Sequence, residues 1–169
     1  MAQPFPDDTF DVAVMPLVIF FVSDPAKGVA EMVRVVGPGG TIATYAWDML
    51  GGGFPLEPIL VEMRAMGLTP LRPPQADASR MEALRDLWTG AGVEAVETRE
   101  IAVQRTFADF DDFWTTNLKS SSVGPTVAAL SPGDAEMLKT RVGARLPADA
   151  GGRITCGARA NAIKGRLPR

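Results

Sequence analysis

The sequence predicts an α/β fold in which four strands form part of a doubly wound sheet, with a helical insertion. Three observations lead to this prediction. The apolar run at residues 12–21 is typical of a strand buried on both faces of a sheet. A helical pattern, a glycine-rich turn and a second apolar strand follow it, which makes a β-α-β unit with a right-handed crossover. Two later segments also have strand patterns and are separated by helical ones.

The first strand is expected at residues 11–19, and Pro16 near its carboxyl end should stop regular pairing there. Asp24-Pro25 is a typical helix start, with Asp as the N-cap and Pro at the first helical position. Apolar residues at spacings of three and four predict that helix, and residues 37–40 (Gly-Pro-Gly-Gly) are expected to end it as a turn. The second strand should cover residues 41–47.

The rest of the chain is expected to form one domain, residues 1–169, together with the first unit. A helical and loop insertion is predicted at 49–80. The other predicted elements are helices at 56–66, 79–89, 110–118 and 131–146, a Ser/Gly loop at 119–125, and strands at 93–107 and 154–163. The last two strands are placed to pair antiparallel.

Composition narrows the classes of function. The net charge of -3 and the pI near 5.0 give no electrostatic reason to expect nucleic-acid binding. The longest apolar run, residues 12–22, is too short to cross a bilayer, and Cys156 is the single cysteine, so a cytoplasmic protein without membrane association is expected. Histidine is absent, which removes Ser-His-Asp catalysis, Cys-His catalysis and His-ligated zinc. No metal site is predicted.

Three clusters have both a structural and a functional interpretation. Residues 90–95 match the dinucleotide pattern G-x-G-x-x-[GA], but a helix precedes them and a strand follows, which favours a helix end. Residues 51–53 (Gly-Gly-Gly) follow a parallel strand, where they could hold a ligand, although a flexible loop is favoured. The acidic cluster Asp109, Asp111 and Asp112 is interpreted as a helix start rather than a metal site.

Three motifs in order resemble those of class I methyltransferases that use S-adenosylmethionine. Residues 3–12 (Gln-Pro-Phe-Pro-Asp-Asp-Thr-Phe-Asp-Val) are similar to the family's L-P-F-x-D-x-x-F-D-V. Residues 17–25 lie where the family shows V-L-H-H-V-x-D, and residues 30–40 are similar to E-x-x-R-V-L-x-P-G-G. The resemblance is to the type 11 group, which includes ubiquinone- and menaquinone-biosynthesis enzymes. It implies a Rossmann-like fold, S-adenosylmethionine as cofactor, and methylation of a small-molecule acceptor.

The chain also departs from this family. The family's first three strands precede the first motif and supply the glycine-rich turn for the methionine end of the cofactor and the acid for its ribose. This chain is therefore expected to be a C-terminal portion that lacks the N-terminal glycine-motif half, with the last four strands of the fold and with Met1 as an internal methionine of a longer parent. Phe20-Phe21 stand where the family has its His pair, so histidine-assisted catalysis is not expected and no catalytic residue is assigned.

The resemblance also implies positions for a binding site. It places two residues near the adenine of the cofactor, Gln3 and Phe5. It places three more at the strand end next to the sulfonium: Met15, Pro16 and Leu17. Three aromatic residues are candidates for the acceptor pocket: Phe20, Trp47 and Trp114. By pattern alone a core role is favoured for Phe20 and Trp47, whereas Trp114 has an equal case for packing and for the pocket.

Two alternatives stay open beside methyltransferase activity of this C-terminal portion. The chain could be a non-catalytic remnant that associates through the exposed strand 11–19, for example as a homodimer. It could also be half of a split enzyme that a complementing N-terminal chain completes.

Overall fold

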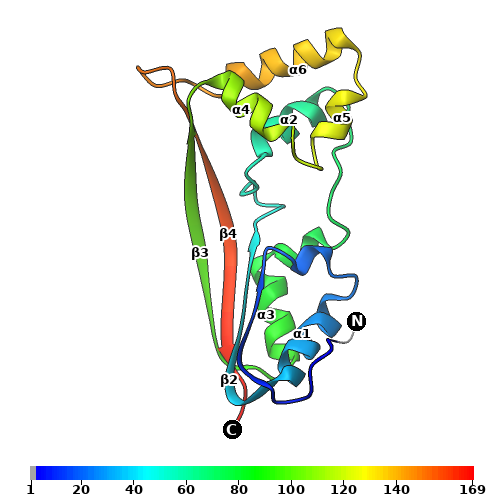
Figure 1. The fold of residues 1–169 in the computed structure, drawn as a ribbon, viewed down its shortest axis with the longest axis vertical. Helices are drawn as coiled ribbons and strands as arrows, with labels where there is room; N and C mark the ends of the chain where they lie inside the picture. Colours follow the sequence, from blue (N-terminus) through cyan, green and yellow to red (C-terminus); the bar gives the residue numbers. More distant parts are fainter. Residues whose placement is uncertain (1–2) are drawn as a thin grey trace. The chain divides into compact units, whose positions relative to one another are not determined.

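The computed structural model describes residues 3–169, which form two compact units. Figure 1 shows the chain in sequence colours. Unit 1 comprises residues 3–53, 73–102 and 159–169, and unit 2 comprises residues 54–72 and 103–158. The predicted insertion at 49–80 thus contributes residues 54–72 to unit 2.

Unit 1 contains a β-α-β unit, two 3-10 helices and a further α-helix. Its own elements are β1 (Phe10–Pro16), η1 (Ile19–Phe21), α1 (Pro25–Val35), β2 (Val36–Trp47), η2 (Ala76–Ser79) and α3 (Met81–Gly90). Two long strands, β3 (Glu94–Phe107) and β4 (Ile154–Arg166), contribute residues to both units.

The four strands form one sheet in the order β1-β2-β4-β3. β1 pairs with β2 in parallel, and β2 pairs with β4 in the antiparallel sense. Ion pairs join Glu97 to Lys164 and Glu100 to Arg159, so residue numbers rise along β3 as they fall along β4. β3 and β4 are therefore antiparallel, as predicted. The predicted α/β fold class with four strands is confirmed.

Helix α1 starts and packs as its sequence predicts. Asp24 caps it by accepting a hydrogen bond from the Lys27 amide at 3.1 Å, and Pro25 occupies the first helical position. Its inner face buries three apolar residues, Val29, Met32 and Val35. Such an apolar stripe gives a surface helix a single face that packs against the sheet.

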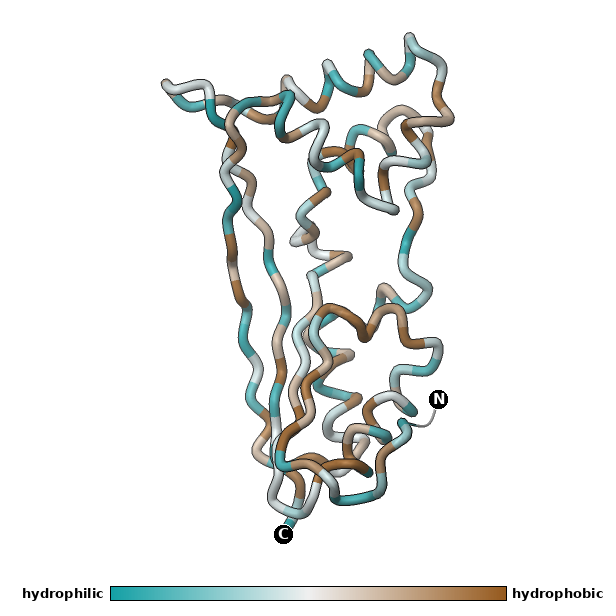
Figure 2. Tube along the Cα trace, in the orientation of Figure 1, coloured by the Kyte–Doolittle hydropathy of each residue, from teal (hydrophilic) through white to brown (hydrophobic). Residues whose placement is uncertain are grey.

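The sheet of unit 1 has one packed face and one exposed face. On the packed face, Ile42 and Ala46 of β2 are fully buried with residues of α1 and α3, and the Trp88 indole donates to the Ile42 carbonyl at 3.4 Å. Ala43 and Tyr45, which alternate with these residues along β2, point the opposite way, because successive side chains of a strand alternate. Val12 and Val14 of β1 lie on this other face and are each 55% exposed. Figure 2 shows hydrophilic and hydrophobic residues in short blocks along β3.

Residues 37–40 form the beginning of strand β2, although their sequence predicts a turn. β2 follows α1 without an intervening loop, and the pairing register with β1 shifts between Phe10 and Val12. A Cβ on Gly40 would lie 2.4 Å from Val36 Cγ1 and 2.8 Å from the Asp11 carbonyl oxygen. Glycine at this position therefore allows two backbone segments to approach more closely than any side chain permits.

Unit 2 contains four helices, α2 (Glu57–Ala65), α4 (Phe110–Asn117), α5 (Gly124–Ala128) and α6 (Pro132–Arg145). Helix α6 is capped by Ser131, whose hydroxyl accepts from the Asp134 amide at 3.1 Å, as the sequence predicts. Helix α5 begins inside the predicted Ser/Gly loop at 119–125, so that loop ends earlier than predicted.

A buried carboxylate joins two of these helices. Glu62 of α2 accepts from Arg141 at 2.7 Å and from Arg145 at 2.6 and 2.8 Å, both on α6. The two guanidinium groups lower the pKa of Glu62, and Arg145 has the larger effect.

In the part of the chain that the structure describes, no helix has both the length and the apolar character needed to cross a membrane.

The close approach at Gly40 gives a first prediction. Gly40→Ala should lower the free energy of unfolding by about 1–3 kcal/mol, because the new methyl would overlap with backbone atoms that cannot move aside. Urea denaturation followed by circular dichroism measures the change. Gly90→Ala is the matched control, since nothing lies within 4 Å of its Cβ position and alanine suits a helix end better than glycine. Equal effects of the two variants would contradict this account.

Candidate functional site

The carboxyl ends of β1 and β2 lie side by side because the two strands are parallel and in register, with Pro16 opposite Tyr45. Two hydrogen bonds close this end of the pair. The Thr44 hydroxyl donates to the Met15 carbonyl at 2.5 Å, and the Leu17 amide donates to the Tyr45 carbonyl at 2.7 Å. Open α/β sheets bind their ligands just beyond this edge.

The three residues predicted to lie beside the sulfonium come together at this edge. Met15 is half-buried against the core of unit 1, Pro16 is exposed, and Leu17 is half-buried. Leu17 has a φ of +54°, in the left-handed region that costs a non-glycine residue about 1 kcal/mol. The chain turns here from β1 toward the 3-10 helix η1. The structure thus places Met15, Pro16 and Leu17 at one strand end, as expected.

Arg34 of helix α1 forms hydrogen bonds that hold the segment before β1 against the helix. Its guanidinium donates to the carbonyl oxygens of Gln3 at 3.2 Å and Phe5 at 2.9 Å, and to the Asp7 carboxylate at 2.7 Å. It also makes a two-point contact with Glu31, at 3.0 and 2.9 Å. A planar guanidinium provides several donors in a fixed arrangement, which suits such a junction. Arg34 therefore fixes the backbone of both residues predicted near the adenine.

Glu31 completes this junction by accepting a hydrogen bond from the Gln3 amide at 2.9 Å. The Arg34 guanidinium, followed by the Gln3 amide, lowers the pKa of Glu31 from 4.5 to about 2. Glu31 and Arg34 belong to the motif at residues 30–40, whose pattern could have identified them. The motif does not by itself say that they contact Gln3 and Phe5.

The three aromatic candidates have different surroundings. Phe20 is only 3% exposed and lies in the core of unit 1, where its ring meets that of Phe21 edge-on at 4.8 Å. Phe21 is the exposed member of that pair, and Trp47 is half-buried beside the same core. Trp114 is buried in the core of unit 2, stacked on Phe110 at 6.2 Å. The predicted roles of these residues in an acceptor pocket stay predictions.

The glycine-rich segment after β2 is tied down by Asp48 and Arg159. The Asp48 carboxylate accepts from the Gly51 amide at 2.8 Å and pairs with the Arg159 guanidinium, which also donates to the Gly51 carbonyl at 3.0 Å. Main-chain bonds join Arg159 to Gly53 at 2.9 Å and to Asp48 at 3.0 Å. The structure corrects the expectation of a flexible loop, because this segment is a fixed turn. Sequence reasoning missed Asp48, which directly follows β2, and Arg159 on β4, because they lie far apart in the chain.

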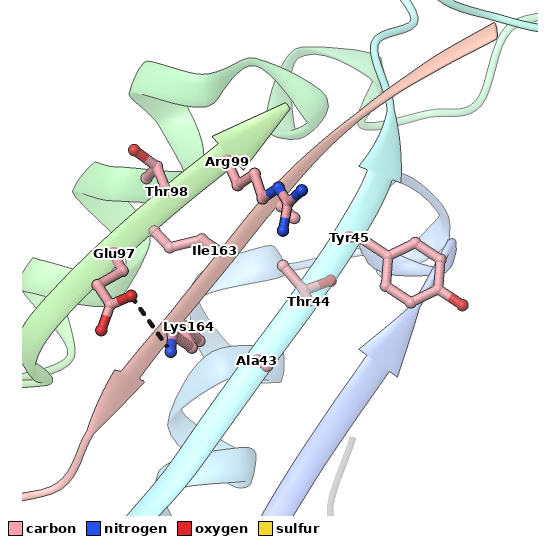
Figure 3. A pocket seen from close by; sticks show the side chains of 9 residues that line it. Ala43, Thr44, Tyr45, Glu97, Thr98, Arg99, Ile163 and Lys164 are labelled. Atoms are coloured by element: carbon pink, nitrogen blue, oxygen red, sulfur yellow. Dashed lines mark ion pairs between the residues drawn. The ribbon is translucent and has the colours of Figure 1, made fainter. Parts of the chain in front are cut away.

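A shallow hollow of about 450 Å³ lies on the exposed face of the sheet in unit 1. Figure 3 shows its side chains, with Tyr45 on β2 and the Glu97–Lys164 ion pair, 3.2 Å long, between β3 and β4. Arg99 lies beside them. None of the eight predicted site residues lines this hollow.

The remaining clusters have structural roles. Helix α3 ends at Gly90, and Gly92 has a φ of +77°, which confirms a helix end at the G-x-G pattern. Asp109 caps α4 by accepting from the Asp112 amide at 2.8 Å, which confirms the helix-start interpretation. Across residues 3–169, no three acidic or cysteine side chains are close enough together to hold a metal ion.

The family model described as "Methyltransferase domain" matches residues 1–44. This segment contains the three motifs, the Arg34 junction and the strand end at Met15 to Leu17. The chain also resembles uncharacterized proteins of Mycobacterium tuberculosis and Mycobacterium bovis, with 40% identity over 50 residues. That similarity covers 30% of this chain and 18% of each relative, so the matched part is about a fifth of the relatives' length.

Solved structures share the fold over almost the whole chain. A provisionally assigned methyltransferase from Bacillus halodurans has a TM-score of 0.54, and the YcgJ protein from Bacillus subtilis has a TM-score of 0.57. Each is 16% identical, and each similarity covers 99% of this chain and 68% of the other chain. These similarities confirm the predicted Rossmann-like fold for the part that the four strands form. The methyltransferase resemblance is confirmed at residues 1–44.

The Glu31 contacts predict a pH-dependent release of the segment before β1. A lowered pKa means that ionised Glu31 stabilises the folded state above its ordinary pKa of 4.5, and that this stabilisation is lost as the pH falls through about 2. The Gln3 amide resonance should therefore shift with a midpoint near pH 2 in an NMR titration. Glu31→Gln should abolish this transition, whereas Glu94→Gln on β3 should not. An unchanged transition in Glu31→Gln would refute the assignment.

The turn after β2 gives a prediction with an internal control. Asp48→Asn should speed hydrogen exchange at the Gly51 amide, because that amide donates to the carboxylate. The Gly53 amide should change less, since it donates to the main-chain oxygen of Asp48 at 2.9 Å. The weakened contact with Arg159 should cost about 1–3 kcal/mol of stability. Asp86→Asn, an exposed change on α3, is the control, and equal exchange at both glycines would contradict this account.

Proposed function

We propose that the chain takes part in S-adenosylmethionine-dependent methylation of a small molecule, with the cofactor at the carboxyl end of β1. The observation that carries this proposal is the match of residues 1–44 to a methyltransferase domain, together with the arrangement that those residues adopt. The matched segment covers 18% of the length of the relatives, and we therefore propose, together with the function, the activity, the cofactor and the acceptor.

The residues at the strand end are chemically compatible with this cofactor. Residues 12–22 contain no charged side chain, so this segment itself brings no cation to the end of β1. Met15, Pro16 and Leu17 would lie beside the sulfonium, and Gln3 and Phe5, held by Arg34, would lie on the adenine side. Phe5 is 45% exposed, so part of its ring surface is accessible to a planar base.

The cofactor supplies an activated methyl group on a positively charged sulfur. The protein's share of the work is to align the acceptor in line with that bond and to exclude water. This task needs no histidine, which agrees with a chain that has none. Phe20 and Trp47, both at the core of unit 1, are the proposed aromatic residues of the acceptor pocket, and a ring face beside the sulfonium would add about 0.5–2 kcal/mol. A cytoplasmic location remains a prediction from the single cysteine.

One structural feature favours a second candidate function, association through strand β1. β1 is at the edge of the sheet, and its Val12 and Val14 side chains are more than half exposed. An apolar edge strand is a template for pairing with another strand. The proposed partner is a second copy of the chain or a complementing N-terminal chain that supplies further strands.

Calorimetric titration with S-adenosylmethionine, combined with light scattering, distinguishes the two functions. Under the methyltransferase proposal the monomer binds the cofactor, and Arg34→Lys weakens binding about tenfold, because lysine cannot hold both carbonyl oxygens and Glu31 at once. Arg85→Lys is the matched control, since Arg85 is exposed on α3 and contacts only Thr98.

Absence of binding, together with a dimer that Val14→Lys dissociates, would reject cofactor binding by this chain and support association through β1. Equal loss of affinity in Arg34→Lys and Arg85→Lys would show that the junction at Gln3 and Phe5 does not shape the cofactor site.

A further inference from the structure

The two faces of the sheet in unit 1 are covered unequally. Helices α1 and α3 pack on one face, where their apolar residues form a common core with those of β2 and β4. Within the described residues of unit 1, no helix covers the opposite face, which carries Val14, Ala43 and Lys164 and is called the open face below. Parallel strands such as β1 and β2 are as a rule covered by helices on both faces.

The β1–β2 side of the open face is apolar. Val12 and Val14 are each 55% exposed, and Tyr45 on the neighbouring strand is 37% exposed. Ile101, two residues beyond Arg99 on β3, adds a fourth large apolar side chain that is 38% exposed. Single exposed apolar residues are common, but several on one face of a sheet mark an interaction surface.

The hollow of about 450 Å³ lies in the middle of the open face. Two alanines line it, because Ala43 is opposite Lys164 and Ala162 is opposite Tyr45 in the pairing of β2 with β4. The Glu97–Lys164 ion pair places Arg99 beside Ala162 on the antiparallel strand β3. Figure 3 shows the Arg99 side chain extended across β4 toward β2. The two methyl groups therefore leave a depression among larger neighbours, which a side chain of a partner can fill.

The β4–β3 side of the open face is positively charged. Arg99 and Arg166 are exposed, and neither forms an ion pair with any residue between 3 and 169. Arg166 is opposite Thr41 and two residues from Lys164, so it points to the same face. Glu97 neutralises only Lys164, at 3.2 Å. This surface is thus cationic, whereas the chain as a whole has a net charge of -3.

We propose that the open face binds an amphipathic α-helix of another protein, with apolar residues on Val12, Val14 and Tyr45 and an acidic flank on Arg99 and Arg166. The proposal goes beyond the proposed function and does not rest on it. A helix matches the layer that covers the opposite face. β1 has seven residues, about 23 Å along a strand, and a helix of about 15 residues has the same length.

Two other occupants fit less well. A second copy of the chain packed face to face would bring Arg99 and Arg166 close to the same cations, and like charges repel. An anionic membrane would attract the cations, but a lipid surface has no ordered side chains to fill the hollow between Ala43 and Ala162.

The test uses three synthetic peptides of about 15 residues, added to the full ¹⁵N-labelled chain without S-adenosylmethionine. The first has a leucine stripe flanked by glutamates, the second has lysines in place of the glutamates, and the third has the first peptide's composition without a stripe. The glutamate peptide should shift the backbone amides of Val14, Ala43 and Arg99 in a saturable way below about 100 µM. The lysine peptide should bind at least about tenfold more weakly, although the chain's net charge alone favours it. The third peptide should give no saturable shift.

Two charge reversals locate the binding surface. Arg99→Glu should weaken binding of the glutamate peptide about tenfold and strengthen binding of the lysine peptide, because it reverses a charge beside the hollow. Arg85→Glu makes the same change at an exposed position of α3, the helix on the covered face, and should alter binding by less than about twofold. Equal effects of the two variants would show a general field effect and overturn the site.

The remaining outcomes also decide the proposal. It is overturned if no peptide gives a saturable shift, or if the lysine peptide binds as tightly as the glutamate peptide. Shifts confined to β1, with none at Arg99, would show pairing along the strand edge instead of docking on the open face. A dimer in light scattering that the glutamate peptide dissociates would make a second copy the occupant. Tighter binding to phosphatidylserine vesicles than to the glutamate peptide would make it a membrane surface.

Discussion

The junction at Arg34 positions much of unit 1. Its side chain holds the backbone at Gln3 and Phe5, and its main-chain oxygen accepts from the Asp8 amide at 3.0 Å. The segment that leads into β1 is thus attached to the last turn of α1, two residues before β2 begins. Because one residue contacts both the entry to β1 and the exit of α1, the relative position of the two parallel strands is set at their amino ends. The same alignment therefore holds at their carboxyl ends, where the candidate site lies.

The close approach at Gly40 makes this arrangement compatible with a direct passage from helix to strand. Most β-α-β units place a loop between the helix and the second strand. Here β2 continues from α1, and the glycines at 37, 39 and 40 take up the change of direction within the strand itself. The short connection leaves little freedom in how far β2 extends, and therefore fixes where Tyr45, Trp47 and Asp48 lie relative to Leu17.

Local signals in the sequence predicted most of the elements but not the contacts between them. Asp24-Pro25, Pro16 and Ser131 marked element ends correctly, since capping and proline effects act within a few residues. The start of β2 was missed because Gly-Pro-Gly-Gly has turn propensity, and only tertiary packing reveals the strand. The sequence could not predict the Asp48–Arg159 pair or the Asn161–Ser79 bond, because no periodic pattern relates residues so far apart in the chain. The burial of Phe20 was likewise not decided by its position after a strand.

The pairing of β2 with β4 has a consequence for the order in which the chain is made. Residues 41–47 hydrogen-bond with residues 160–166, about a hundred residues later. At synthesis rates of about 5–20 residues per second, β2 waits on the order of ten seconds for this neighbour. During that time β1, α1 and β2 can assemble by local contacts, but the second edge of β2 remains open. The nascent chain therefore passes through a stage in which this edge of β2 is unpaired, and a chaperone that shields β2 would have its largest effect at that stage.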